Sequence, residues 1–131
     1  WLSHTENRMK MPLCIWQHGK SFRQEQDQVT KNMRLKEFYQ LEFQCIYGLT
    51  TQNDYSLAII STVERMLSDF VGPCHTEDSD RLPDYSEKTV DVICDKTNME
   101  ICSISLRKDF TNAKVLEVAI GTDRCVFNFN Q

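Results

Sequence analysis

Arginine and carboxylate residues recur in this sequence at spacings that suit the handling of phosphate groups. From Phe22 to Glu42 the chain reads Phe-Arg-x-Glu, then a polar stretch, then Arg-x-x-x-Phe-x-x-x-Glu. A second segment of interest, VLEVAIGTDR, ends on Arg124. Arginine binds phosphate through two parallel N–H donors, and carboxylates bind Mg²⁺ or an ammonium group. These residue types suit a site that binds phosphate groups, and chemistry at such a site depends on positioning and charge stabilisation.

The residue types required for this chemistry occur along the whole chain. The arginines are candidates for phosphate contacts, and the glutamates are candidates for contacts to Mg²⁺ or to an ammonium group. They are Arg23, Arg34, Arg107 and Arg124, and Glu25, Glu42, Glu100 and Glu117. The alternative for each is an ordinary solvated charge, which contributes little to stability or function.

Residues 36–47 have the clearest strand pattern in the chain. Alternation predicts an apolar face with Tyr39, Leu41, Phe43, Cys45 and Tyr47. The opposite face would carry Phe38, Gln40, Glu42 and Gln44. A face with one aromatic and three polar side chains is either exposed to solvent or forms the floor of a ligand site.

The other segments predict further strands and one long helix. Residues 12–18 predict a strand, a second strand follows Gly19 and holds Phe22 to Glu25, and the polar residues 26–33 predict the loop of a hairpin. Residues 54–70 predict a helix that Asn53 or Asp54 caps and Gly72-Pro73 ends. Its apolar face would lie in the core and carries Ile59, Ile60, Val63, Met66, Leu67 and Phe70.

The C-terminal half completes an α+β pattern. Residues 74–88 predict a polar connection, residues 89–94, 99–107 and 114–120 predict strands, and TDRCVFNF predicts the start of a helix. Strands with one long helix between them favour an antiparallel sheet over repeated βαβ units.

Bulk properties limit the class of protein. A chain of 131 residues suits one domain, and its net charge of −4 argues against a general nucleic-acid coat. No apolar run approaches the roughly 20 residues that span a bilayer, and the N-terminus has no secretory signal, so we expect a cytoplasmic protein. Because the chain begins with Trp1, we expect a fragment or trimmed chain.

Other chemistries find little support. The six cysteines have no C-x-x-C spacing, which predicts free buried thiols and no zinc site. The sequence HGKS at 18–21 lacks the upstream glycine of a P-loop, because Cys14 occupies that position. The three histidines show no spacing typical of a catalytic triad.

Several segments together resemble one enzyme family. PLCIWQHGKSFRQE and the RLKEF that follows look like motif 2 of the class II aminoacyl-tRNA synthetases, and VLEVAIGTDR looks like motif 3. YSEKTVDVIC and MEICSISLRKDF look like intervening segments of the glycyl-tRNA synthetases. The matches run in order over about residues 11–127, so the chain resembles a class II synthetase catalytic core, closest to the glycyl enzymes. The resemblance implies an α+β domain over residues 1–131, an antiparallel sheet flanked by helices, without motif 1 or an anticodon-binding domain.

The resemblance also implies a role for each candidate residue. Arg23 would bind the α-phosphate of ATP and the amino-acid carboxylate, Glu25 the adenine amino group, and Arg34 the γ-phosphate. Phe38 would stack under adenine, Arg124 would stack over it or hold the γ-phosphate, and Arg107 would line the ATP site. The amino-acid site would comprise Glu42, Glu100 and Ala119, and Glu100 and Glu117 would serve Mg²⁺ or the ligand ammonium. Ala119 stands where glycyl enzymes carry a serine, and Asp123 where they often have glycine.

The implied activity is that of a ligase dependent on ATP and Mg²⁺. It would activate a small amino acid, glycine first, as an aminoacyl-adenylate for transfer to the tRNA acceptor end or another acceptor. A homodimer is expected if motif 1 is supplied elsewhere, and no membrane partner is expected. Two alternatives stay open: a relative that forms amides or adenylates without charging tRNA, and a non-catalytic paralogue that binds nucleotide, nucleic acid or protein.

Overall fold

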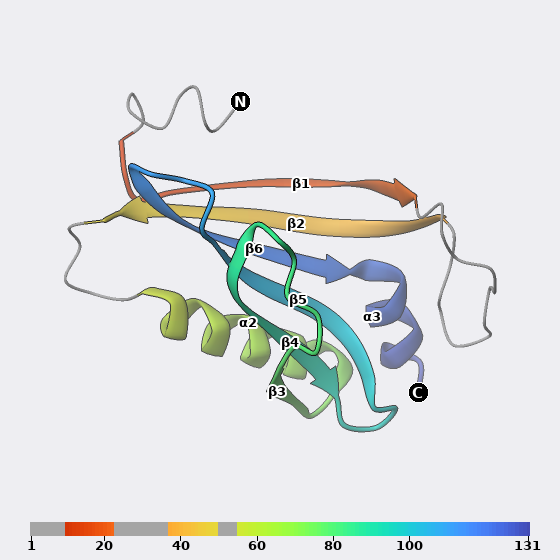
Figure 1. Ribbon diagram of the computed structural model, residues 1–131. Coiled ribbons are helices and arrows are strands. Elements are labelled where there is room, and N and C mark those ends of the chain that lie inside the picture. Colours follow the sequence, from red (N-terminus) through yellow and green to blue (C-terminus); the bar gives the residue numbers. More distant parts are fainter. Residues whose placement is uncertain (1–9, 23–36, 50–54) are drawn as a thin grey trace.

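A six-stranded antiparallel sheet organises the computed structural model, which describes residues 10–22, 37–49 and 55–131. The strands lie in the order β1-β2-β6-β5-β4-β3. Their bounds are β1 Leu13–Phe22, β2 Glu37–Gly48, β3 Cys74–Asp78, β4 Ser86–Cys94, β5 Met99–Arg107 and β6 Ala113–Gly121. Helices α2 (Tyr55–Val71) and α3 (Thr122–Phe129) lie on the same side of the sheet (Figure 1). The expected α+β fold with an antiparallel sheet is confirmed.

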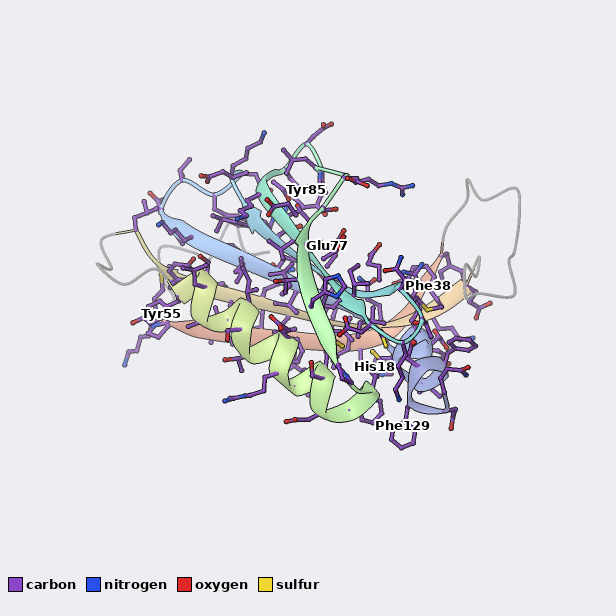
Figure 2. The ribbon with its side chains drawn as sticks, turned by 90° about the horizontal axis from the view of Figure 1, so that it is seen from below. His18, Phe38, Tyr55, Glu77, Tyr85 and Phe129 are labelled. Carbon is purple, nitrogen blue, oxygen red and sulfur yellow. The ribbon has the colours of Figure 1, made fainter. Side chains whose placement is uncertain are left out.

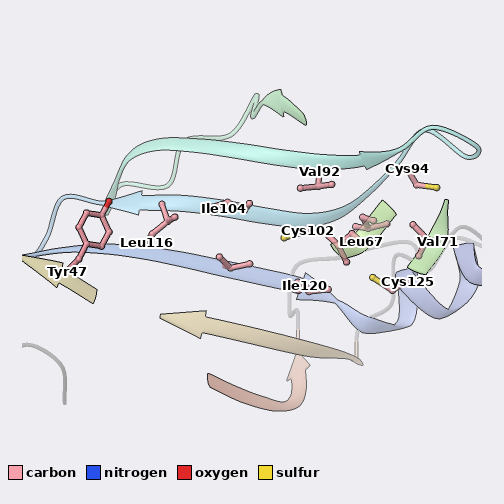
Figure 3. Packing of buried hydrophobic residues seen from close by; sticks show 12 residues of the cluster. Tyr47, Leu67, Val71, Val92, Cys94, Cys102, Ile104, Leu116, Ile120 and Cys125 are labelled. Carbon is pink, nitrogen blue, oxygen red and sulfur yellow. The ribbon is translucent and has the colours of Figure 1, made fainter. Parts of the chain in front are cut away.

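Alternation along the strands produces two different sheet faces. The register pairs Leu41 with Ile120, Phe43 with Val118 and Cys45 with Leu116. The β6 side chains pack with Leu67 and Val71 of α2 and with Cys125 of α3 in the main hydrophobic core (Figure 3), and the three β2 side chains pack against this cluster. The predicted apolar face of residues 36–47 is therefore the face that the helices cover, and the predicted polar face is the opposite one.

Helix α2 ends where the sequence predicts. Gly72 has a φ of +100°, a conformation that glycine adopts without strain, and its N–H donates to the Ser68 carbonyl oxygen. The predicted core face is partly wrong, because Met66 is 46% exposed and Phe70 is 48% exposed, whereas Leu67 is buried. Neither α2 nor α3 is long and apolar enough to cross a membrane. The predicted capping positions, residues 53 and 54, lie outside the described residues.

Two predicted boundaries differ from the structure at the edges of the sheet. Strand β1 runs through Gly19 without a break, because all ten of its residues pair with β2. Residues 74–88 are not simply a connection, since Cys74–Asp78 form edge strand β3 and Ser86 begins β4. An edge strand contacts the core weakly, so its polar sequence resembles a loop. The predicted loop at residues 26–33 lies outside the described residues.

Candidate functional site

The sheet face opposite the helices carries polar side chains in rows that cross the strands. One row contains Gln17, Glu42, Ala119, Ser103, Asp91 and Glu77. The neighbouring row contains Ile15, Gln44, Glu117, Ser105 and Thr89. Three predicted site residues, Glu42, Glu117 and Ala119, thus come together from two strands that are far apart in the sequence.

An amide at the centre of this face holds two carboxylates. The Gln44 Nε2 donates to Glu42 Oε1 at 2.8 Å and to Glu117 Oε2 at 2.7 Å. The Gln17 Nε2 donates to Glu42 Oε2 at 3.0 Å. Both oxygens of Glu42 therefore accept from neutral amides, and no described lysine, arginine or histidine forms an ion pair with it. Within the described part of the chain, Glu42 therefore presents negative charge on the sheet face that no cation pairs with.

Glu117 differs from Glu42 because a cation neutralises it. The Arg107 Nη1 donates to Glu117 Oε2 at 3.0 Å, and its other nitrogens donate to both oxygens of Asp109 at 3.0 and 2.6 Å. Its guanidinium carbon lies 4.7 Å from the centroid of the Tyr85 ring and 5.3 Å from the centroid of the Phe110 ring. The Asp109 carboxylate raises the pKa of Arg107, and Arg107 lowers the pKa of Asp109.

Tyr85 joins this group from the connection between β3 and β4. Its hydroxyl donates to Glu117 Oε1 at 3.4 Å, and desolvation followed by the charge of Glu117 raises its pKa. Figure 2 shows Tyr85 well separated from Phe38, which lies beside α3. The polar face therefore has two ends, one marked by Tyr85 and Arg107 and the other by Phe38 and α3.

Arg124 marks the second end. Its Nη1 donates to the Glu100 carbonyl oxygen at 2.7 Å, and a β-carbon added at Gly121 would lie 3.7 Å from its Cδ. Gly121 is opposite Gln40 in the register, two residues from Phe38. The Asp123 carboxylate accepts from the Tyr39 backbone N–H at 2.5 Å and ties the start of α3 to β2. Phe38 and Arg124 thus lie at the same end of the sheet.

Two pairs of residues that we expected to share a binding site lie far apart in the structure. Arg107 is opposite Val115, six residues along β6 from Gly121, or about 20 Å at ~3.4 Å per residue. Glu100 lies five residues along β5 from Ser105, the partner of Glu117, which is about 17 Å. Glu100 and Glu117 are therefore too far apart to bind one Mg²⁺ together, and no group of three potential metal ligands occurs among the described residues. The expected ATP contact of Arg107 stays a prediction.

Sequence reasoning missed several members of the site. Gln44 is on the predicted face but had no predicted role, and Gln17 was not singled out. Tyr85, Asp109 and Phe110 lie in the segments YSEKTVDVIC and MEICSISLRKDF, which carry the resemblance, but they had no predicted role either. The signal for Asp109 and Phe110 was present in LRKDF, directly after Arg107. Three predicted site residues, Arg23, Glu25 and Arg34, lie outside the described residues.

Comparison with known proteins identifies the fold. The sequence matches no protein-family model and no curated protein. Two solved structures of pyrrolysyl-tRNA synthetase from Desulfitobacterium hafniense are similar, each with a TM-score of 0.67. They are 17% and 16% identical over 95% and 96% of this chain, which spans 44% of the length of each. The described sheet and helices therefore have the fold of part of a class II synthetase catalytic domain, and closeness to the glycyl enzymes is not shown.

Proposed function

We propose that this protein uses ATP to activate a small amino acid as an aminoacyl-adenylate, which tRNA or another acceptor then receives. The observation that carries the proposal is Glu42, a carboxylate fixed by two amides that has no cationic partner among the described residues. An amino-acid ammonium group supplies the missing positive charge and forms charge-assisted hydrogen bonds. The likeness of the fold to a tRNA synthetase supports the same reading.

The neighbours of Glu42 favour a short side chain on the amino acid. Its row continues with Ala119 and Ser103, which are small, whereas Gln44 and Glu117 fill the adjoining row. A ligand bound through its ammonium at Glu42 has room over Ala119 and Ser103 and meets long side chains on the Gln44 side. Glycine is our first choice, with alanine or serine tolerated because one methyl group changes binding by only about 1–3 kcal/mol.

The arrangement also suits the approach of the two reactants. Glu42 is opposite Ala119, two residues or about 7 Å along the strand from Gly121, where the Arg124 side chain lies. Adenine between Phe38 and Arg124 would place its phosphates toward Glu42, so that the amino-acid carboxylate reaches the α-phosphate. Mg²⁺ usually binds through substrate phosphates and one or two carboxylates. We assign Glu100 to it, since Glu100 lies at the Arg124 end, and assign Glu117 to positioning around Gln44.

The test is ATP–pyrophosphate exchange across the twenty amino acids. Glycine should drive exchange fastest, and Glu42→Gln should lower the rate with glycine on the order of 10²-fold, since it replaces a charged partner of the ammonium with a neutral one. Glu77→Gln is the matched control, because Glu77 lies in the same row at the opposite sheet edge. Exchange that depends on a large or charged amino acid, with Glu42→Gln unchanged, would refute the glycine assignment.

A second candidate is a non-catalytic paralogue that binds nucleotide, nucleic acid or protein. It is favoured by Arg107, whose charge is matched by Asp109 and Glu117. Saturable ATP binding without exchange for any amino acid would support this candidate over the enzyme.

A further inference from the structure

Two thiols meet across the β1–β2 pair on the sheet face that the helices cover. Cys14 and Cys45 are opposite each other in the register, and their Sγ atoms lie 3.5 Å apart. Cys14 is exposed and Cys45 is half-buried. We propose that these two cysteines are a modification site for low-molecular-weight disulfides, which convert them reversibly into a cross-strand disulfide. The inference is independent of the proposed function.

The geometry requires little movement. A disulfide has an S–S length of about 2.05 Å, so the two sulfur atoms must approach by roughly 1.5 Å. Directly opposite residues of antiparallel strands have Cβ atoms about 4.5–5.5 Å apart, close to the separation that a disulfide needs. Side-chain rotation brings the sulfur atoms together once a backbone adjustment of up to about 1 Å has moved the two Cβ atoms into the disulfide range of about 3.5–4.5 Å. The register of β1 and β2 stays as it is.

The exposure of the two thiols sets the order of events. A Cys14 thiolate attacks one sulfur of glutathione disulfide, and the first glutathione leaves as a thiolate. The Cys45 thiolate then attacks the Cys14 sulfur and displaces the second glutathione. Two protein thiols lose two protons and two electrons, and the glutathione disulfide gains them to form two thiols. Cys14 reacts first because it is exposed, whereas burial, followed by the contact with Cys14, raises the pKa of Cys45 to about 12. The second step is intramolecular, so the proximity of the two sulfur atoms offsets the small fraction of Cys45 thiolate.

The crosslink would stabilise an edge of the sheet that carries part of the polar face. Among the described strands β1 lies at the edge and pairs with β2, and its Gln17 donates a hydrogen bond to Glu42. Cys14 and Cys45 are 31 positions apart in the chain. Closing a loop of that length should raise the melting temperature on the order of 10 °C, if loop entropy dominates.

The chain contains its own control pair. Cys74 and Cys94 are also opposite each other, in β3 and β4. However, the Cys74 thiol donates to the Gly72 carbonyl oxygen at 3.2 Å, and Cys94 is fully buried. We therefore expect this second pair to remain reduced under conditions that oxidise the first.

The experiment incubates the reduced full chain with glutathione disulfide, alkylates the remaining thiols and maps the peptides without reduction. A peptide pair linked through Cys14 and Cys45, lighter by two hydrogens, is expected, together with the rise in melting temperature and its reversal by a reductant. Cys45→Ala should stop at a mixed disulfide on Cys14, and Cys14→Ala should leave Cys45 unmodified. The proposal is wrong if the wild-type chain stops at the mixed disulfide, or if it links Cys74 to Cys94 equally fast. Both outcomes are measured on the wild type, so they do not depend on whether a variant folds.

Discussion

Replacing Arg107 by methionine should destabilise the protein far more than loss of an ordinary surface cation. The Arg107–Glu117 contact is 3.0 Å, and the two side chains are only 22% and 15% exposed. With an effective dielectric constant of about 20, the gross attraction is roughly 5 kcal/mol at that distance. Desolvation and side-chain ordering offset about half of this attraction. An exposed ion pair contributes about 0–1 kcal/mol to stability and breaking a buried pair costs about 3–5 kcal/mol, and this partly buried pair lies between the two cases. We expect a loss of about 2–3 kcal/mol in the free energy of unfolding.

Urea unfolding of four proteins measures this value directly. They are the wild type, Arg107→Met, Glu117→Gln and the double variant, which together form a double-mutant cycle. Methionine keeps most of the hydrophobic bulk beside Tyr85 and Phe110, so the change is mainly one of charge. The coupling energy should be on the order of 1–2 kcal/mol for the Arg107–Glu117 pair. Asp109 also loses its partner, but in both proteins that carry Arg107→Met, so its contribution cancels in the cycle.

Lys88 provides the matched control. It also lies on a strand and pairs with Asp78, but at 3.6 Å and with side chains 60% and 84% exposed. Lys88→Met should change the free energy of unfolding by less than about 0.5 kcal/mol. If Arg107→Met and Lys88→Met lose the same stability, or the cycle shows no coupling, the reading of Arg107 as the support of Glu117 is wrong.

Two further predictions concern the nucleotide end and the outer edge of the sheet. Phe38→Ala should weaken ATP binding by about 1–3 kcal/mol through lost stacking on adenine, and calorimetry that shows unchanged affinity would contradict the assignment. His75 donates or accepts at Asp95 (2.5 Å) and Glu77 (2.9 Å), and these carboxylates, Asp95 foremost, raise its pKa. Because the pKa is higher in the folded state, protonated His75 stabilises the fold fully at pH values below its unfolded-state pKa of about 6.5. This stabilisation is lost as the pH rises through the folded-state pKa. The stability difference between wild type and His75→Gln should therefore be larger at about pH 5.5 than at about pH 8.5, and urea unfolding that shows the opposite trend would refute it.

Local sequence patterns were sufficient for several elements of the fold. The alternation of residues 36–47 identified strand β2 and assigned Phe38, Gln40, Glu42 and Gln44 to its polar face, because the strand period of two depends only on backbone geometry. Gly72 ended α2 for an equally local reason, its positive φ. Edge strand β3 was missed because a polar strand that contacts the core weakly has no local pattern that distinguishes it from a loop.

Tertiary structure alone decided which functional side chains meet. Gln17 of β1 contacts Glu42 of β2, and Gln44 of β2 contacts Glu117 of β6. These contacts depend on the register of strands that are distant in sequence. The same register separates Arg107 from Arg124 and Glu100 from Glu117, although each residue type suited the same chemistry. The sequence by itself determined the faces on which these residues lie, through the two-residue period of a strand. Only the pairing of the strands determined their positions along those faces, because pairing is set by long-range packing and not by any local pattern.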